Sequence, residues 1–198
     1  FVFSSIFSFK YLVSLDSVYY FNESFNDLIS KFNLWESYNY PFGGINLILW
    51  LHPITYTAGY LGKFLNLDWN ILVRLFFYIP SIILSFYSIQ KLANAFNIRE
   101  KGKFLISLVY VFNTYFILLV DGGQLGIMLA YGVLPLAVES IIKFKFYKTL
   151  TVLSIITIFD PRFLLLSIIL GLLLSKFNFH KIFKLLGVLV FVLLINFY

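Results

Sequence analysis

The sequence lacks cysteine and carries few charged residues. Without cysteine, the 198-residue chain forms no disulfide, thiol nucleophile or cysteine-based metal site. Charged residues make up 12% of the chain, roughly half the share in a soluble globular domain. The phosphate-binding loop GxxxxGK[ST], the zinc motif HExxH and the nucleophile motif GxSxG are absent too. These absences argue against the common nucleotide-hydrolysing, zinc-protease and serine-hydrolase classes.

The chain is instead dominated by apolar residues. Hydrophobic residues make up 61% of it, and its mean hydropathy is +0.90. Several apolar runs approach or exceed the roughly 18 residues of a membrane-spanning helix. The net charge of +6 comes from lysines in short connections between these runs, a pattern typical of cytoplasmic loops and not of a nucleic-acid surface. We therefore expect an all-α, polytopic helical protein of the cell membrane. Its expected partner is the lipid bilayer, and we expect no nucleic acid partner.

Loop charges predict how the chain crosses the membrane. Residues 16–44 carry four acidic residues against Lys31, whereas residues 91–103, 143–148 and 176–184 each carry a net charge of +3. Lysine and arginine mark the cytoplasmic side. We therefore expect the three basic segments inside and residues 16–44 as an outer first loop.

Three runs then fit spanning helices: 69–92, 103–120 and 125–142. The sequence DGGQ at 121–124 lies between the last two runs. It is expected to form a tight turn on the outer side, in which glycine supplies a positive φ.

We interpret residues 1–198 as a single transmembrane domain that is incomplete at both ends. The sequence opens without methionine and stops inside an apolar run. Residues 182–198 are expected to begin a further span.

Two segments do not fit a simple span. Residues 45–66 begin and end on the outer side and are interrupted by His52-Pro53, so we expect re-entrant or interface-lying helices. Residues 149–175 begin and end inside and are split at 160–162. Each arm of about a dozen residues is roughly 18 Å long, against a hydrocarbon core of about 30 Å. This predicts a short re-entrant hairpin, with one kinked span as the alternative.

Ionisable groups are expensive to bury in so apolar a protein, and they are therefore candidates for function. The predicted topology brings five of them to the outer half of the membrane: Asp16, His52, Asp121, Asp160 and Arg162.

Each of these groups also has a structural interpretation. The two isolated aspartates fit helix caps, the histidine fits a hydrogen-bonding residue beside Pro53, and Asp160 with Arg162 fits an ion pair. Glu139 and Lys143, one helical turn apart, are expected to form a surface pair.

The order of several motifs resembles a known family. Asp16 is followed by LWESYNYPFGGIN at 34–46, LHP at 51–53, FNTYFILLVDGGQLGIMLAYGVLPLAVES at 112–140 and FDPRFLL at 159–165. This order resembles the GT-C-type membrane glycosyltransferases. It is especially similar to their YfhO-like relatives, some of which are described as 6-pyruvoyl-tetrahydropterin synthase-related membrane proteins.

The resemblance implies a GT-C-like helical core with an active site on the outer face. It also implies transfer of a sugar from a polyprenyl-phosphate-linked donor to an acceptor. Asp16 matches the family's first-loop carboxylate and would act as general base or as ligand of a divalent metal. Arg162 would steady the departing phosphate. Further substrate-binding residues would line the same cavity: Asp121, Gln124, His52 and Asp160.

The sequence also departs from the family pattern. Asp16 is followed by Ser17 where many members have a second acid, Thr114 stands where proline is usual, and Glu36 follows Trp35 where asparagine is usual. Two other classes stay open. One is a transporter or flippase-like protein, whose broken helices and buried charges would line a substrate path. The other is a structural membrane component, in which polar groups only hold helices together.

Overall fold

The computed structural model describes residues 35–36, 44–45, 51–175 and 179–196. Within these residues, two short strands pair antiparallel, with Trp35 opposite Ile45, and the other regular elements are helical. In chain order the elements are β1 (Trp35–Glu36), β2 (Gly44–Ile45), α3 (His52–Leu65), α4 (Trp69–Val73), the π-helical turn η3 (Arg74–Tyr78), α5 (Ile79–Ala95), α6 (Glu100–Val111), α7 (Thr114–Asp121), α8 (Leu125–Lys143), α9 (Phe146–Phe159), α10 (Pro161–Leu174) and α11 (Phe179–Asn196).

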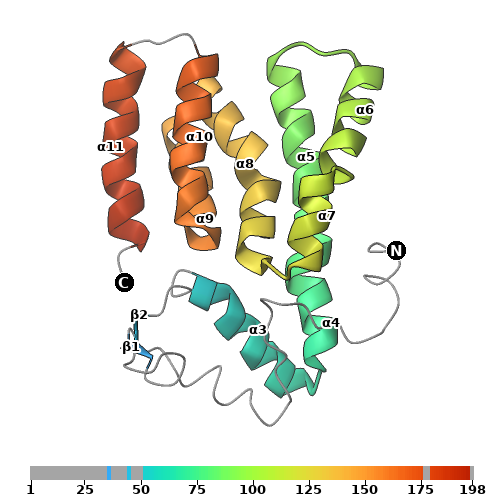
Figure 1. The fold of residues 1–198 in the computed structure, drawn as a ribbon. Helices are drawn as coiled ribbons and strands as arrows, with labels where there is room; N and C mark the ends of the chain where they lie inside the picture. The colour runs from blue at the N-terminus through green and yellow to red at the C-terminus, as the bar shows by residue number, and fades with distance from the viewer. Residues whose placement is uncertain (1–34, 37–43, 46–50, 176–178, 197–198) are drawn as a thin grey trace.

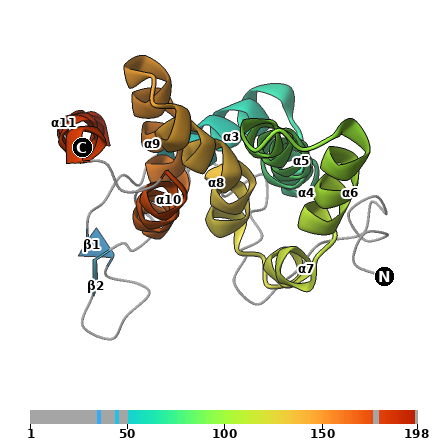
Figure 2. The same cartoon turned by 90° about the horizontal axis from the view of Figure 1, so that it is seen from above.

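The helices from α5 onward run up and down beside one another, and α8 lies at the centre (Figures 1 and 2). α8 packs against α5, α9 and α10, whereas α11 packs against α9 at one edge. α3 lies at an angle across the lower end of this bundle in Figure 1.

The two ends of the bundle differ in charge. We call the lower end in Figure 1 the turn end, because residues 121–124 and Asp160 reverse the chain there. We call the opposite end, where α5, α8 and α10 finish, the lysine-rich end. Its described basic residues lie close to those helix ends: Lys91, Arg99, Lys101, Lys103, Lys143, Lys145, Lys148, Lys181 and Lys184.

Three helical stretches in the described part of the chain are long and apolar enough to cross a membrane. They are Trp69–Ala95, Glu100–Asp121 and Leu125–Lys143, and they contain the three runs expected to span. The prediction of a helical protein with apolar helices of spanning length is therefore confirmed. α9 and α10 are shorter, with 14 residues each. Each is roughly 21 Å long, less than a hydrocarbon core of about 30 Å, and they meet at Asp160 within the segment 149–175.

The first two spanning stretches are not regular α-helices throughout. Trp69–Ala95 contains the π-helical turn η3 just before Pro80. Proline has no N–H to donate to the carbonyl four residues back, and a local π-helical turn is one way in which a membrane helix accommodates that loss. The second stretch is interrupted at Phe112 and Asn113, between α6 and α7. Asn113 then begins α7, since its side-chain oxygen accepts a hydrogen bond from the Phe116 N–H at 2.8 Å.

Two tyrosines form hydrogen bonds between the second and third stretches. Pro135 lies inside α8, so the Tyr131 carbonyl lacks its usual helical donor. The Tyr110 hydroxyl of α6 donates to that carbonyl at 2.8 Å, and the Tyr131 hydroxyl donates to the Tyr110 carbonyl at 3.1 Å. The two rings stack with centroids 4.3 Å apart, and Asn113 donates to the Tyr131 hydroxyl. Backbone carbonyls near the break in one stretch and near the proline in the other therefore each accept a hydrogen bond from a tyrosine of the neighbouring stretch.

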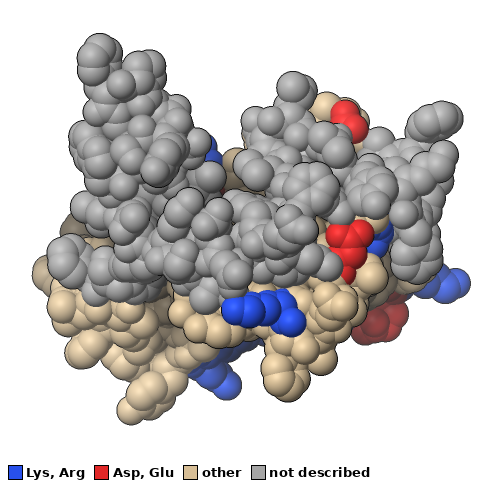
Figure 3. Space-filling model, turned by 90° about the horizontal axis from the view of Figure 1, so that it is seen from below, with Lys and Arg blue, Asp and Glu red and all other residues tan. Residues whose placement is uncertain are grey.

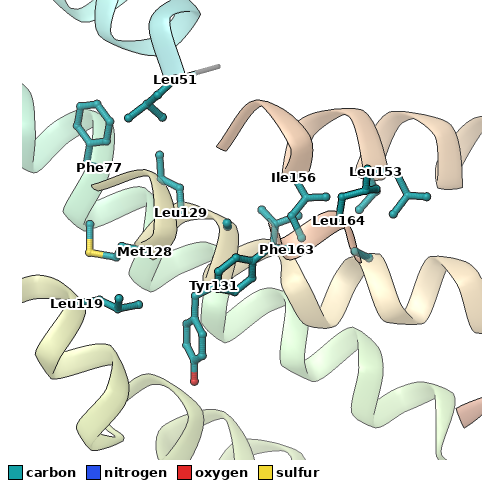
Figure 4. Close-up of a cluster of buried hydrophobic side chains, with 14 of the residues drawn as sticks. Leu51, Phe77, Leu119, Met128, Leu129, Tyr131, Leu153, Ile156, Phe163 and Leu164 are labelled. Atoms are coloured by element: carbon teal, nitrogen blue, oxygen red, sulfur yellow. The ribbon is translucent and has the colours of Figure 1, made fainter. Parts of the chain in front are cut away.

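The buried core forms around α8. Met128 and Leu129 of α8 are 0% and 2% exposed, and they lie among side chains from α7, η3 and the α9–α10 hairpin (Figure 4). Labelled neighbours in this view include Leu51, Phe77, Leu119, Ile156 and Phe163. This core brings the start of α8, the hairpin and the residue before α3 close together.

Small residues let α5 approach α8. Ser81, Ser85 and Ser88 of α5 are fully buried, and the Ser88 hydroxyl donates to the Gly132 carbonyl at 2.5 Å. A Cβ atom on Gly132 would lie 3.0 Å from the Ser81 carbonyl oxygen. Close contact through small residues is typical of helix pairs in membranes, where packing and hydrogen bonds drive association.

Candidate functional site

The predicted turn at 121–124 is built by its two glycines. The Gly122 N–H donates to the Leu118 carbonyl at 2.8 Å, and the Gln124 N–H donates to the Leu119 carbonyl at 3.1 Å. Gly123 has a φ of 66°, which favours glycine. Asp121 is the last residue of α7 and is exposed beside this turn. The turn therefore presents a carboxylate at the turn end without using that carboxylate as a cap in the described contacts.

Asp160 and Arg162 form the tip of the α9–α10 hairpin. The Arg162 side chain donates to both Asp160 oxygens, with Nε to Oδ1 at 3.0 Å and Nη2 to Oδ2 at 2.6 Å. Asp160 also caps α10, accepting from the Arg162 backbone N–H at 2.8 Å. The carboxylate is 2% exposed, whereas the Arg162 side chain is 70% exposed. The hydrogen bonds to Asp160 raise the pKa of the Arg162 guanidinium above its ordinary value, so this cation stays charged.

Three of the predicted site segments meet at Gly126. A Cβ atom built on Gly126 would lie 2.7 Å from the carbonyl oxygen of Phe159 and 3.4 Å from Cδ2 of Leu51. Phe159 directly precedes Asp160, Leu51 directly precedes His52, and Gly126 follows Gln124 by two residues. Residue 126 therefore has to be glycine for these segments to approach one another this closely.

His52 and Asp16 differ in how far the structure describes them. His52 is the first residue of α3, and Pro53 occupies the first turn of that helix, where proline is well tolerated. In the described chain, His52-Pro53 thus starts a helix. Asp16 lies outside the described residues, and so does most of the expected outer loop 16–44.

The metal prediction depends on that undescribed carboxylate. Within the part of the chain that the structure describes, no three or more His, Cys, Asp or Glu side chains gather closely enough to hold a metal ion. A divalent metal held by Asp16 stays a prediction.

The structure adds one cation that the sequence reasoning missed. Arg74 is 7% exposed and lies in η3, inside a stretch long enough to span a membrane. Its Nη1 donates to the Asn70 carbonyl at 2.7 Å and also to the Asn70 side-chain oxygen. Asp68 acts electrostatically on the same guanidinium. A charged residue inside the run WNILVRLFFYIP was the available signal, because such residues are functional candidates by default.

Tyr78 links η3 to the turn end. It is 1% exposed, and its hydroxyl approaches the Val120 carbonyl at 3.5 Å. Val120 directly precedes Asp121, so Arg74 lies on a helix whose next turn contacts the predicted site segment.

The described part of the turn end carries charges of both signs. Figure 3 shows described acidic and basic side chains on this face. Described charged residues of this end include Asp68, Asp121, Asp160, Lys63, Arg74 and Arg162.

Comparison with known proteins found no match: no protein-family model, curated protein or solved structure matches this chain. The fold defines the class of this chain only coarsely. It is a helical protein whose described part contains three helices long and apolar enough to cross a membrane.

Proposed function

We propose that this protein is a GT-C-like membrane glycosyltransferase, which transfers a sugar from a polyprenyl-phosphate-linked donor at the outer face. The observation that supports the proposal is the meeting of three segments at Gly126. These segments carry Gln124, His52 and Asp160. They are far apart in the sequence, and His52 and Asp160 are ionisable groups that the loop charges predict at the outer side.

The proposed chemistry needs a base for the acceptor hydroxyl and a cation for the departing phosphate. Asp16 is the proposed base or metal ligand, with Asp121 and Gln124 as groups that hydrogen-bond to sugar hydroxyls. Arg162 is exposed at the hairpin tip and would bind phosphate while Asp160 holds its guanidinium in place. Arg74 is a second proposed cation on the same side of the bundle.

The proposal is tested by sugar transfer with the full-length protein, reconstituted in vesicles with a polyprenyl-phosphate-linked sugar. Asp16→Asn is expected to lower the transfer rate by about 100-fold or more, because general-base catalysis contributes about that much. Glu100→Gln is the matched control: its carboxylate is 89% exposed at the lysine-rich end, and the rate should stay within about twofold of the unmodified protein. Equal rates for Asp16→Asn and the unmodified protein would remove Asp16 from its role. Absence of sugar transfer by the unmodified protein would contradict the proposed glycosyltransferase activity.

A transporter is the second candidate, and specific features favour it. One spanning stretch is broken at Phe112 and Asn113, and another holds Arg74 in a π-helical turn. Broken helices and buried charges mark substrate paths in transporters. In the same vesicles, movement of a lipid-linked sugar between leaflets without transfer to an acceptor would support this candidate over the first.

A further inference from the structure

A second polar cluster lies at the lysine-rich end, far from the proposed active site. Glu139 of α8 is buried, with its side chain 3% exposed, and it pairs with Lys143 at 3.2 Å and with Lys148 of α9. The sequence predicts a surface pair for Glu139 and Lys143. The pair is present, but the prediction of a surface position was wrong for the glutamate, because α9 brings Lys148 over it.

This cluster continues onto α11. Lys181 donates from its Nζ to the Ile142 carbonyl in the last turn of α8 at 3.0 Å, and Lys184 follows one helical turn later. Lys145 lies between α8 and α9. Five lysines against one glutamate leave this cluster with a net charge of +4. We call it the Glu139 cluster: Glu139, Lys143, Lys145, Lys148, Lys181 and Lys184.

The Glu139 cluster combines fixed and exposed positive charge. Glu139 holds two ammonium groups in place, yet the side chains of Lys143 and Lys148 remain 47% and 38% exposed. Each ammonium group has three donors, so one shared carboxylate does not satisfy them all. The remaining donors suit an anionic oxygen.

Exposed aromatic side chains flank these lysines. Tyr147, Phe179 and Phe183 are 82%, 82% and 72% exposed. Aromatic rings beside lysines at the end of apolar helices are typical of the level of the lipid headgroups. Anionic phospholipid headgroups supply negative charge at this level of the membrane.

We propose that the Glu139 cluster is a binding site for the headgroup of an anionic phospholipid, formed where α8, α9 and α11 meet at the lysine-rich end. The phosphate lies against the lysines, and the acyl chains lie along the exposed apolar side chains of α11. Glu139 positions Lys143 and Lys148 and does not touch the lipid. This site is independent of the proposed glycosyl transfer.

Native mass spectrometry of the detergent-purified protein tests the proposal, with phosphatidylglycerol and phosphatidylcholine as the probes. We expect phosphatidylglycerol to bind about tenfold more tightly than phosphatidylcholine. The variant Lys143→Gln/Lys148→Gln/Lys181→Gln should lose about tenfold in affinity for phosphatidylglycerol. The matched control Lys91→Gln/Lys101→Gln/Lys103→Gln removes three lysines from the same end, and it should lose less than about twofold.

A second variant avoids disturbing Glu139. Lys181→Gln/Lys184→Gln leaves both ion pairs of Glu139 intact and should lose about fivefold in affinity for phosphatidylglycerol. Equal losses in the cluster and control variants would overturn the proposal, since binding would then follow overall charge. Equal binding of the two lipids would overturn it as well. Displacement of the lipid by inorganic phosphate at equal concentration would show a free-anion site and would also overturn it.

Discussion

Helices α8 and α11 are nearly equal in length, with 19 and 18 residues, and both are mostly apolar, yet they lie in different surroundings. α8 packs against α5, α9 and α10, and most of its residues are buried. α11 packs against α9 and exposes large side chains, among them Phe183, Val190 and Leu194. Hydrophobicity alone therefore does not separate a central helix from a peripheral one in this protein.

The difference between the two helices lies in what surrounds their glycines. A Cβ on Gly132 of α8 would press on the backbone of α5, at 3.0 Å from the Ser81 oxygen. A Cβ on Gly187 of α11 would meet no atom of the described chain within 4 Å. A glycine in an apolar helix thus marks a helix contact only where a partner backbone comes close.

The largest effect is expected from filling the α5–α8 contact. Gly132→Leu should destabilise the protein by about 3 kcal/mol, because the new side chain meets backbone that cannot move aside easily. Thermal unfolding of the purified protein in detergent measures the change. Gly187→Leu is the matched control and should change stability by less than about 0.5 kcal/mol. Equal losses in the two variants would contradict the contrast between α8 and α11.

A smaller effect is expected at Pro135. Tyr110→Phe removes the hydroxyl that donates to the Tyr131 carbonyl, which leaves that carbonyl without this donor in a partly buried position. The expected loss is about 1–2 kcal/mol in the same unfolding experiment. Tyr147→Phe removes a hydroxyl from a side chain that is 82% exposed, and it should have no measurable effect. An unchanged midpoint of thermal unfolding for Tyr110→Phe would show that the hydrogen bond from Tyr110 to the Tyr131 carbonyl does not contribute to stability.

The smallest effect is expected at the hairpin tip. Asp160→Ala removes the cap of α10 and should cost about 1 kcal/mol. The ion pair adds little to this, because the Arg162 side chain is 70% exposed. Asp121→Ala serves as the control, since that residue is exposed at the end of α7. A loss for Asp160→Ala as large as that for Gly132→Leu would show that the tip is part of the tightly packed centre.

The sequence was sufficient to predict the helical class and the approximate spans. Long apolar runs separated by short basic connections are strong signals, because burial of the backbone in lipid requires helices. The paired Asp160 and Arg162 were also accessible from the sequence, since the two residues are local to one helix start. In that pair the hydrogen bonds show the ion pair of the structural interpretation, and they show in addition that Asp160 caps α10.

Other features depend on contacts between distant residues, which a single sequence does not show. Glu139 was expected at the surface because its partner Lys148 comes from another helix. The reciprocal bonds between Tyr110 and Tyr131 arise because a helix break and a proline happen to lie at the same level. Arg74 differs from these cases, since its charge within an apolar run is visible in the sequence itself.

The central claim is that the predicted site segments gather at the turn end and that this end faces outward. Because the chain contains no cysteine, single cysteines can be introduced and labelled in intact cells with a membrane-impermeant maleimide. Asp121→Cys should react from outside, and Lys101→Cys at the lysine-rich end should react only after the membrane is opened. The reverse pattern would place the turn end in the cytoplasm and would contradict an active site on the outer face.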